Sequence, residues 1–197
     1  MNGTATETLD PFITPDELGH ALGGEELDSE QAQWLCEWGS EAVRAEVAQT
    51  INVIEGDEVM LDGLGSPLIL LPELEVREVR GVCLGEEELR PGVDYEWNAA
   101  GCLWRRRSYW YDRVEIPWPK RPRALRVTYD HGWAPRSPQW NAARQVALEV
   151  AARTFRNPGM LQSERLGDWS RAWVPRGGRA ELTPAEQRSL DILRTGR

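Results

Sequence analysis

Two long helix-like segments enclose a strand-like segment, and this order constrains the fold more than any other feature of the chain. The first, residues 28–50, contains one glycine and no proline. Its apolar side chains recur at three- and four-residue steps, as on one face of an amphipathic helix: Leu35, Trp38, Ala42 and Ala45. The second, residues 137–157, is rich in alanine and stops at Asn157-Pro158-Gly159. Because alanine permits close approach, we expect these two helices to pack on each other.

Two shorter helices are predicted from capping signals. Thr14-Pro15-Asp16-Glu17 combines a capping threonine, a proline suited to the first turn and a glutamate three residues after the cap. It predicts a helix over about residues 14–22. The same signal recurs at Thr183-Pro184-Ala185-Glu186 and predicts a final helix that runs to about Arg194.

The segment between the long helices, about residues 57–130, is typical of strands. Its runs of β-branched and aromatic residues are separated by glycine and proline. Residues 125–129 alternate apolar and polar side chains, as in a half-buried strand. Val76, Val79 and Val82 do not alternate strictly, which leaves the register of that strand open.

Together these elements predict an α+β fold: a small helical bundle with an inserted antiparallel β sheet or hairpin arm, then a C-terminal extended arm and a short helix. We expect residues 1–157 to form a single domain, with helices at about 14–22, 28–50 and 137–157 and a β insertion at about 57–130. Residues 158–197 would form the arm and the last helix, since this segment is too polar for a core of its own.

Charge is distributed unevenly along the chain. Residues 1–100 hold 4 Lys/Arg and 23 Asp/Glu, whereas residues 101–197 hold 19 Lys/Arg and 9 Asp/Glu, and the net charge is −9. An acidic half and a basic half could attract each other head to tail between copies of the chain. The alternative is that both halves are simply solvated surfaces. General binding of duplex nucleic acid is disfavoured, because phosphate contacts require net positive charge.

Other classes are disfavoured by the sequence. The longest apolar run, at residues 68–71, is too short to span a membrane. Residues 1–7 lack the basic cluster and apolar core of a secretory signal, so we expect none. Cys36, Cys83 and Cys102 are odd in number and far apart, so we interpret them as free thiols in a reducing compartment.

We predict no catalytic, cofactor-binding or metal-binding site. His131 follows a predicted strand and precedes a turn, where catalytic residues often lie. However, no Gly-x-Ser-x-Gly motif supplies a nucleophile and no phosphate-binding glycine loop is present. A zinc site built on His131 and His20 would need distant cysteines. We therefore expect a non-enzymatic protein in which His131 orders the turn.

Ten tryptophans in 197 residues are unusual. Half of them fall in or beside the predicted β insertion, with basic clusters at residues 105–107 and 120–121 among them. Three interpretations stay open. The aromatic residues could form the core and rim of a small sheet, a protein–protein interface, where Trp, Tyr and Arg are enriched, or a stacking platform for sugar or single-stranded nucleic acid.

Several short motifs follow one another in a distinctive order. They are Ile13-Thr14-Pro15-Asp16-Glu17-Leu18, Leu27-Asp28 with Gln31-Ala32, Leu70-Leu71-Pro72-Glu73-Leu74, Gly92-Val93-Asp94-Tyr95-Glu96-Trp97, residues 127–135 (VTYDHGWAP), residues 163–169 (SERLGDW) and Leu182-Thr183 with Glu186. The most specific is the turn at 127–135, followed by the Ala-rich helix. Over about residues 12–194, this succession resembles the head–tail connector (adaptor) proteins of tailed bacteriophages, in the form with a β insertion.

The resemblance implies a structural protein of the virion neck, at the head–tail interface, assembled in the host bacterial cytoplasm. Its subunits would form a closed ring, usually of twelve, under the portal. The implied partners are further copies of the chain, the portal protein, a tail-side neck protein (a stopper or tail terminator), and double-stranded DNA passing through the lumen without sequence-specific binding. An acidic lumen would repel phosphates and let DNA slide. No membrane partner and no cofactor is expected.

The resemblance also suggests interface residues. Candidates for the portal interface are Arg165, Trp169, Arg171, Trp173, Arg176, Leu190 and Leu193. Candidates for a tail-side or subunit interface are Trp97, Trp104, Arg105, Arg106, Arg107 and Trp110. Trp169 and Trp173 would anchor the arm on the portal, unless both pack back on the chain's own bundle. Two other functions stay open: another neck or tail-end protein (stopper or tail completion), and a Trp-rich carbohydrate-binding module.

Overall fold

The computed structural model describes residues 9–25, 27–108, 113–156, 163–166, 169–172 and 182–194. The chain divides into two compact units. The helical unit comprises Met1–Ala48 and Pro135–Thr195, and the β unit comprises Gln49–Ala134 with Gly196–Arg197. The predicted organisation, a single domain over residues 1–157 followed by an arm, stays a prediction.

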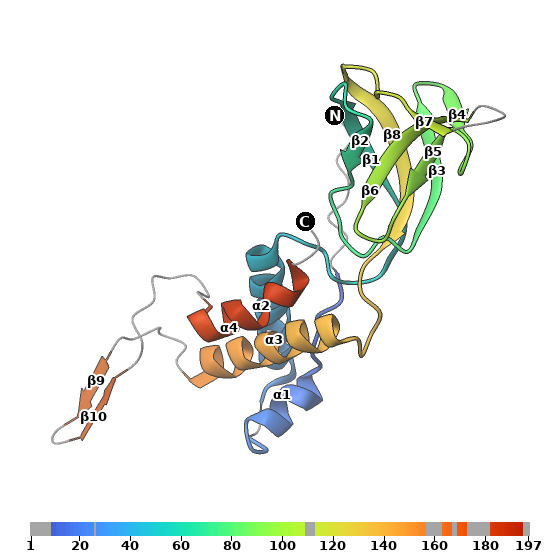
Figure 1. Ribbon diagram of the computed structural model, residues 1–197. Helices are drawn as coiled ribbons and strands as arrows, with labels where there is room; N and C mark the ends of the chain where they lie inside the picture. The colour runs from blue at the N-terminus through green and yellow to red at the C-terminus, as the bar shows by residue number, and fades with distance from the viewer. Residues whose placement is uncertain are drawn as a thin grey trace. The chain divides into compact units, whose positions relative to one another are not determined.

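The described part of the helical unit contains four α-helices and a short 3-10 helix (Figure 1). They are α1 (Pro15–Ala21), α2 (Ser29–Val47), α3 (Pro138–Arg156), α4 (Pro184–Ser189) and η1 (Asp191–Leu193). Between α3 and α4 in the sequence, β9 (Ser163–Leu166) and β10 (Trp169–Ala172) form an antiparallel hairpin. Both predicted capping boxes are confirmed: Thr14 and Glu17 cap α1 reciprocally, as Thr183 and Glu186 cap α4.

The contact between α2 and α3 brings the two backbones together. A Cβ atom on Gly39 of α2 would lie 2.5 Å from the carbonyl oxygen of Ala147 on α3 and 3.4 Å from Cβ of Ala151. Both alanines are fully buried. The predicted packing of the two long helices on each other is therefore confirmed, and it depends on small residues on both sides.

The apolar face predicted for α2 is rotated from the observed one. Of the four residues expected there, Leu35 alone is buried, whereas Trp38 and Ala42 are half-buried and Ala45 is exposed. The buried face consists of Ala32, Leu35, Cys36, Gly39, Ser40, Val43, Arg44 and Val47. Because the close approach to α3 requires the smallest side chain at the contact, Gly39 turns inward and the bulky Trp38 moves to the rim.

The segment before α1 is tied to α2. The Phe12 backbone N–H donates to Ser40 Oγ at 2.9 Å, and the Arg44 guanidinium donates to the Asp10 carbonyl at 2.6 Å. The same guanidinium lies over the Phe12 ring, 4.6 Å from its centroid, and the Trp140 ring meets Phe12 edge-on at 5.3 Å. These contacts explain why polar Ser40 and Arg44 occupy the buried face of α2.

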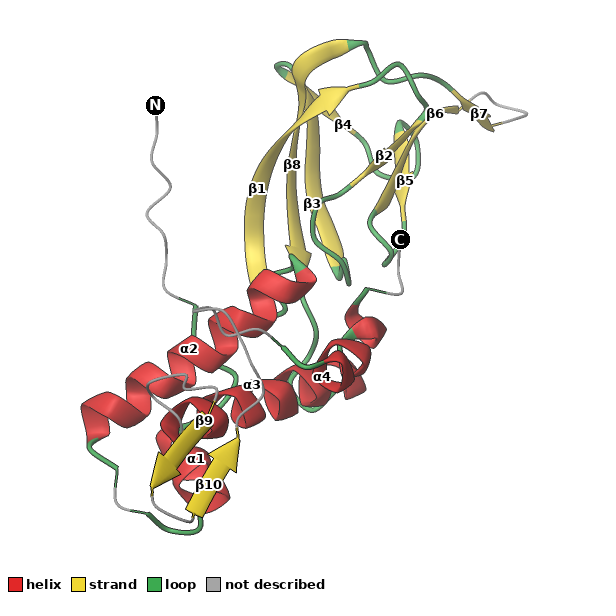
Figure 2. Ribbon diagram, turned by 90° about the vertical axis from the view of Figure 1, so that its left-hand side faces the viewer, coloured by secondary structure: helices red, strands yellow, loops and turns green. Residues whose placement is uncertain are grey.

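Two antiparallel sheets form the β unit (Figure 2). The first has the order β1-β8-β3-β4, from β1 (Ile54–Gly63), β8 (Arg121–His131), β3 (Glu78–Leu84) and β4 (Glu87–Leu89). The second has the order β2-β6-β5, from β2 (Leu68–Leu70), β6 (Cys102–Ser108) and β5 (Tyr95–Trp97), and β7 (Arg113–Glu115) pairs with β6.

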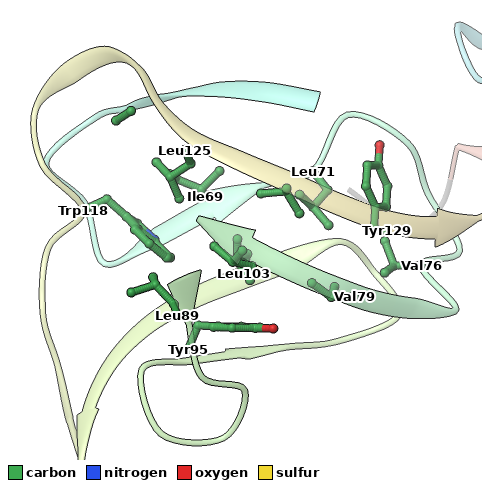
Figure 3. Packing of buried hydrophobic residues seen from close by; sticks show 13 residues of the cluster. Ile69, Leu71, Val76, Val79, Leu89, Tyr95, Leu103, Trp118, Leu125 and Tyr129 are labelled. Atoms are coloured by element: carbon green, nitrogen blue, oxygen red, sulfur yellow. The ribbon is translucent and has the colours of Figure 1, made fainter. Parts of the chain in front are cut away.

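Side chains from both sheets share one core (Figure 3). Leu125 and Tyr129 of β8 and Val79 of β3 lie with Leu103 of β6 and Tyr95 of β5 in one buried cluster. The indole of Trp118, which follows β7, is fully buried in the same cluster. Burial of large aromatic and branched side chains between two sheets gives this unit its own hydrophobic core.

The predicted architecture, a small helical bundle with an inserted antiparallel β sheet or hairpin arm, is wrong. The chain is a mixed α+β protein in which the insertion forms two four-stranded antiparallel sheets among the residues described. The sequence pattern was obscured by a β-bulge in β3. The register shifts between Val79 and Gly81, so that Val79 and Val82, three residues apart, both point into the core.

We predict opposite effects for two glycine-to-alanine changes in the helical unit. Gly39→Ala should lower the free energy of unfolding by about 1–3 kcal/mol, because the new methyl group collides with the α3 backbone. Gly19→Ala, in α1, meets no heavy atom within 4 Å and should raise stability by up to about 1 kcal/mol through helix propensity. Chemical denaturation of the full chain measures both. Equal effects of the two changes would contradict the close contact.

Candidate interaction surfaces

The turn that carries the most specific sequence motif closes the β unit. Gly132 has a φ of +96°, and a Cβ atom there would lie 2.0 Å from the Asn52 carbonyl oxygen. The next residue, Trp133, donates its backbone N–H to the Ile51 carbonyl at 3.0 Å. The segment that leaves the β unit thus lies against the segment that enters it, at a separation that only glycine permits.

His131 is enclosed beside this turn rather than exposed. Its side chain is 2% exposed, and its Nε2 lies 3.3 Å from Asp57 Oδ2. The ring centroid is 5.0 Å from that of Tyr129. Burial raises the pKa of the Tyr129 phenol, and the Asp57 and Glu73 carboxylates act in the same direction, so the phenol stays protonated at neutral pH.

No cluster of three or more His, Cys, Asp or Glu side chains that could hold a metal ion occurs within the described ranges. In those ranges, too, no helix is long and apolar enough to cross a membrane.

The charge asymmetry of the sequence is not an asymmetry between the two units. The helical unit, residues 1–48 and 135–195, holds 11 Lys/Arg and 17 Asp/Glu, and residues 49–134 hold 11 and 15, so both are net acidic. Basic residues of the second half pair with acidic residues of the first half inside each unit. These pairs are Arg144–Glu17 at 2.5 Å, Arg194–Glu46 at 2.6 Å and Arg106–Glu96 at 3.3 Å. Some of the oppositely charged residues of the two sequence halves therefore form ion pairs within one chain and not between chains.

The predicted tail-side or subunit candidates lie on β5 and β6, except for Trp110, which lies outside the described residues. Trp97 and Trp104 are half-buried. Arg105 donates to the Pro117 carbonyl at 2.8 Å and lies over the Trp118 ring at 5.5 Å.

Of the three consecutive arginines, Arg107 alone is exposed. Arg106 is held between Glu96 and Glu115, the latter at 3.0 Å. Among the described residues, Arg107 makes no ion pair. Arg107 and Val114 are cross-strand partners on β6 and β7, and Val114 is 42% exposed.

One face of the second sheet is apolar and partly exposed. Leu68 pairs with Trp104 and Leu70 with Cys102, so these four side chains lie on the same face. Leu70 is 55% exposed, and Leu64, in the turn before β2, is 69% exposed. Together with the half-buried Leu68 and Trp104, Leu70 makes this a partly exposed apolar face, and such faces are typical of protein-binding surfaces.

The portal candidates divide into three groups. Arg165, Trp169 and Arg171 lie on the β9–β10 hairpin, where Trp169 is the register partner of Leu166. Trp173 and Arg176 lie outside the described residues. Leu190 and Leu193 are fully buried in the helical unit. For these two leucines, portal contact would require the last helix to leave its own unit, and all seven assignments stay predictions.

The last helix is held by charge as well as by apolar contact. Glu186 is 4% exposed, forms an ion pair with Arg153 of α3 and accepts the Thr183 backbone N–H. Burial alone would raise the pKa of Glu186, but the Arg153 guanidinium and the Thr183 N–H outweigh it, so that the pKa lies below its ordinary value of 4.5. Arg194 also donates to the Glu46 carbonyl at 2.6 Å.

An acidic–aromatic face on α2 was missed at the level of sequence. Trp34 is 51% exposed and stacks on Trp38 with a centroid distance of 5.6 Å and an interplanar angle of 18°. Glu30, Glu37 and Glu41 lie at neighbouring positions on the same side of the helix, at steps of four, three and seven residues from Trp34. The signal was present in the sequence, but Trp38 was placed on the apolar side.

No family model and no curated protein matches the sequence. The fold is similar to that of a chain in a solved structure described as the neck of an empty GTA (gene transfer agent) particle computed with C6 symmetry. The two are 14% identical, the comparison covers 100% of this chain and 94% of that chain, and the TM-score is 0.52. At this identity the likeness establishes the fold.

The ion pair of Glu186 makes a prediction about stability and pH. Glu186→Gln should lower the free energy of unfolding by about 1.5–3 kcal/mol at neutral pH, since a buried charged hydrogen bond is lost. Because the folded-state pKa is depressed, this contribution exists above pH 4.5, the ordinary value, and is lost as the pH falls through the folded-state pKa. The difference between wild type and variant should therefore shrink on acidification.

The matched control is Glu149→Gln on α3, an exposed glutamate that accepts a hydrogen bond from Gln145. It should change stability by less than about 0.5 kcal/mol. Denaturant titrations between about pH 3 and pH 7 measure both variants. A Glu186→Gln effect that is independent of pH would contradict the assigned pKa direction.

Proposed function

We propose that the chain is a non-enzymatic structural subunit of the neck of a tailed-phage-like particle, of the head–tail connector (adaptor) type. The observation that carries this proposal is the fold likeness to a particle neck over the whole chain. The order of sequence motifs from Ile13 to Glu186 supports it independently. The enclosed position of His131 gives the one catalytic candidate no exposed imidazole to act with.

In the proposed neck, copies of the chain form a closed ring between the portal protein and a tail-side neck protein. A ring requires two different complementary patches on each subunit. The chain offers several unlike surfaces, among them the apolar sheet face at Leu70 and the acidic–aromatic face at Trp34. Rings of six or twelve equivalent subunits both satisfy a six-fold axis, and the resemblance favours twelve.

Net acidity of both units supports a passive channel for double-stranded DNA, because carboxylates repel phosphates. The carbohydrate-binding alternative has less support. Trp118 and Trp133 are buried and Trp97 and Trp104 are half-buried, so that, among the described residues of the β unit, few indole faces are open for stacking on a sugar.

The direct test is to locate the chain in particles. We expect an epitope tag fused to the chain to label the neck between head and tail in electron micrographs, with twelve copies per particle by quantitative mass spectrometry. A tag on the major tail protein, which labels the tail along its length, is the control. Absence of the chain from purified particles would contradict a virion role, and labelling at the tail tip would favour the tail-completion alternative.

A second prediction concerns the C-terminal arm as the portal contact. The double change Trp169→Ala and Trp173→Ala should weaken binding of the portal protein by about 2 kcal/mol or more, as for aromatic anchors in general, without loss of the fold. Ile192→Ala, which truncates a 43% exposed apolar residue in the same unit, is the control. A plain deletion of residues 158–197 is unsuitable, because it removes the buried Leu190 and Leu193. Undiminished portal binding would overturn the assignment.

A further inference from the structure

The acidic–aromatic face of α2 is defined by Glu30, Trp34, Glu37, Trp38 and Glu41, none of which belongs to the buried face of the helix, although Glu37 and Trp38 are half-buried. Trp34 leaves 51% of its surface exposed although it stacks on Trp38. Large exposed aromatic side chains are costly in water and are characteristic of binding anchors. The three glutamates give the surroundings of the two indoles a negative charge.

A side chain that suits this face is a cation with apolar surface beside it. An arginine guanidinium stacks on an indole and forms bidentate hydrogen bonds with a carboxylate, which an ammonium group does less well. An aliphatic neighbour would cover the remaining edge of the indole. The face therefore selects for an exposed arginine next to an exposed aliphatic residue.

The chain itself presents such a pair in its β unit. Arg107 on β6 and Val114 on β7 are cross-strand partners, Arg107 is exposed and Val114 is 42% exposed. The strand that carries Arg107 is firmly held, because Arg106 is fixed between Glu96 and Glu115 and Arg105 is bonded to the Pro117 carbonyl. A rigid support reduces the conformational entropy that binding would cost.

We propose that the acidic–aromatic face of α2 in one copy binds the Arg107–Val114 pair of a neighbouring copy. In this contact the Arg107 guanidinium covers the Trp34 indole and pairs with Glu37, while Val114 packs beside the indole edge. The two patches differ, so the contact is heterologous and can be repeated around a ring. The inference rests on the proposed function, since it names the contact between subunits of the proposed ring.

The experiment uses two charge reversals in the full chain, Glu37→Arg and Arg107→Glu. Each variant alone places like charges at every contact and should associate at least tenfold more weakly than wild type in sedimentation velocity. An equimolar mixture of the two should recover association, because the basic helix face of one variant meets the acidic strand of the other. The association of wild type should weaken between about 0.05 and 0.5 M salt.

Glu149→Arg is the matched control, because Glu149 accepts from Gln145 on α3 as Glu37 accepts from Gln33 on α2, each four residues earlier. It should leave association unchanged. Trp34→Ala should also weaken association by at least tenfold, with the helical circular dichroism retained.

Three results would overturn the inference. One is a mixture that stays as dissociated as its components, which would mean that the two patches meet within one chain or not at all. The second is unimpaired association of Glu37→Arg, and the third is a wild-type chain that is monomeric at about 1 mM. If both charge-reversal variants still form rings, the proposed contact is wrong but the proposed neck function is unaffected. If wild-type chains associate through this contact into open filaments, the contact is supported and the closed ring is contradicted.

Discussion

The β unit depends on one close contact between the segments that enter and leave it. The Trp133 N–H bonds to the Ile51 carbonyl, and Gly132 lies where any side chain would strike Asn52. When the two ends of an inserted unit are adjacent, the unit that it interrupts loses little conformational entropy, because only a short gap separates its two segments. The contact also lets the insertion fold around its own core, since its ends need not span the helical unit. The contact consists of the Trp133 hydrogen bond and of a close approach that is possible because Gly132 has no Cβ atom.

The sequence predicted correctly those features that depend only on interactions between residues close together in the chain. The capping boxes at Thr14 and Thr183 require only side chains three residues apart, and both form as predicted. The turn at Gly132 was recognised through resemblance, but its reason lies 80 residues earlier at Asn52 and is invisible without the structure. Sequence could identify the motif, although it could not say what the glycine avoids.

Predictions that depend on tertiary contact were less successful. The bulge at Arg80 breaks the alternation of β3, so that the sequence indicated the strand but not which of its valines face the core. The face of α2 was misplaced because the apolar period was read from Trp38, whereas the close contact at Gly39 decides the orientation of the helix. Leu190 and Leu193, which the resemblance suggests as portal contacts, are fully buried in their own unit, and their assignment to the portal stays a prediction.

Because α4 and the residues that follow it are packed into the helical unit, the segment between α3 and α4 is attached to that unit at both of its ends. That segment is fixed at one end by α3 and at the other by a helix whose Leu190, Leu193 and Glu186 are buried. It is thus a closed loop rather than a loose tail. A loop fixed at both ends searches a smaller volume before it meets a partner, so less entropy is lost on capture. Force applied to the segment would reach α3 at one end and α4 at the other. Tension on the segment would therefore be passed to two helices of one folded unit and not to a free chain end.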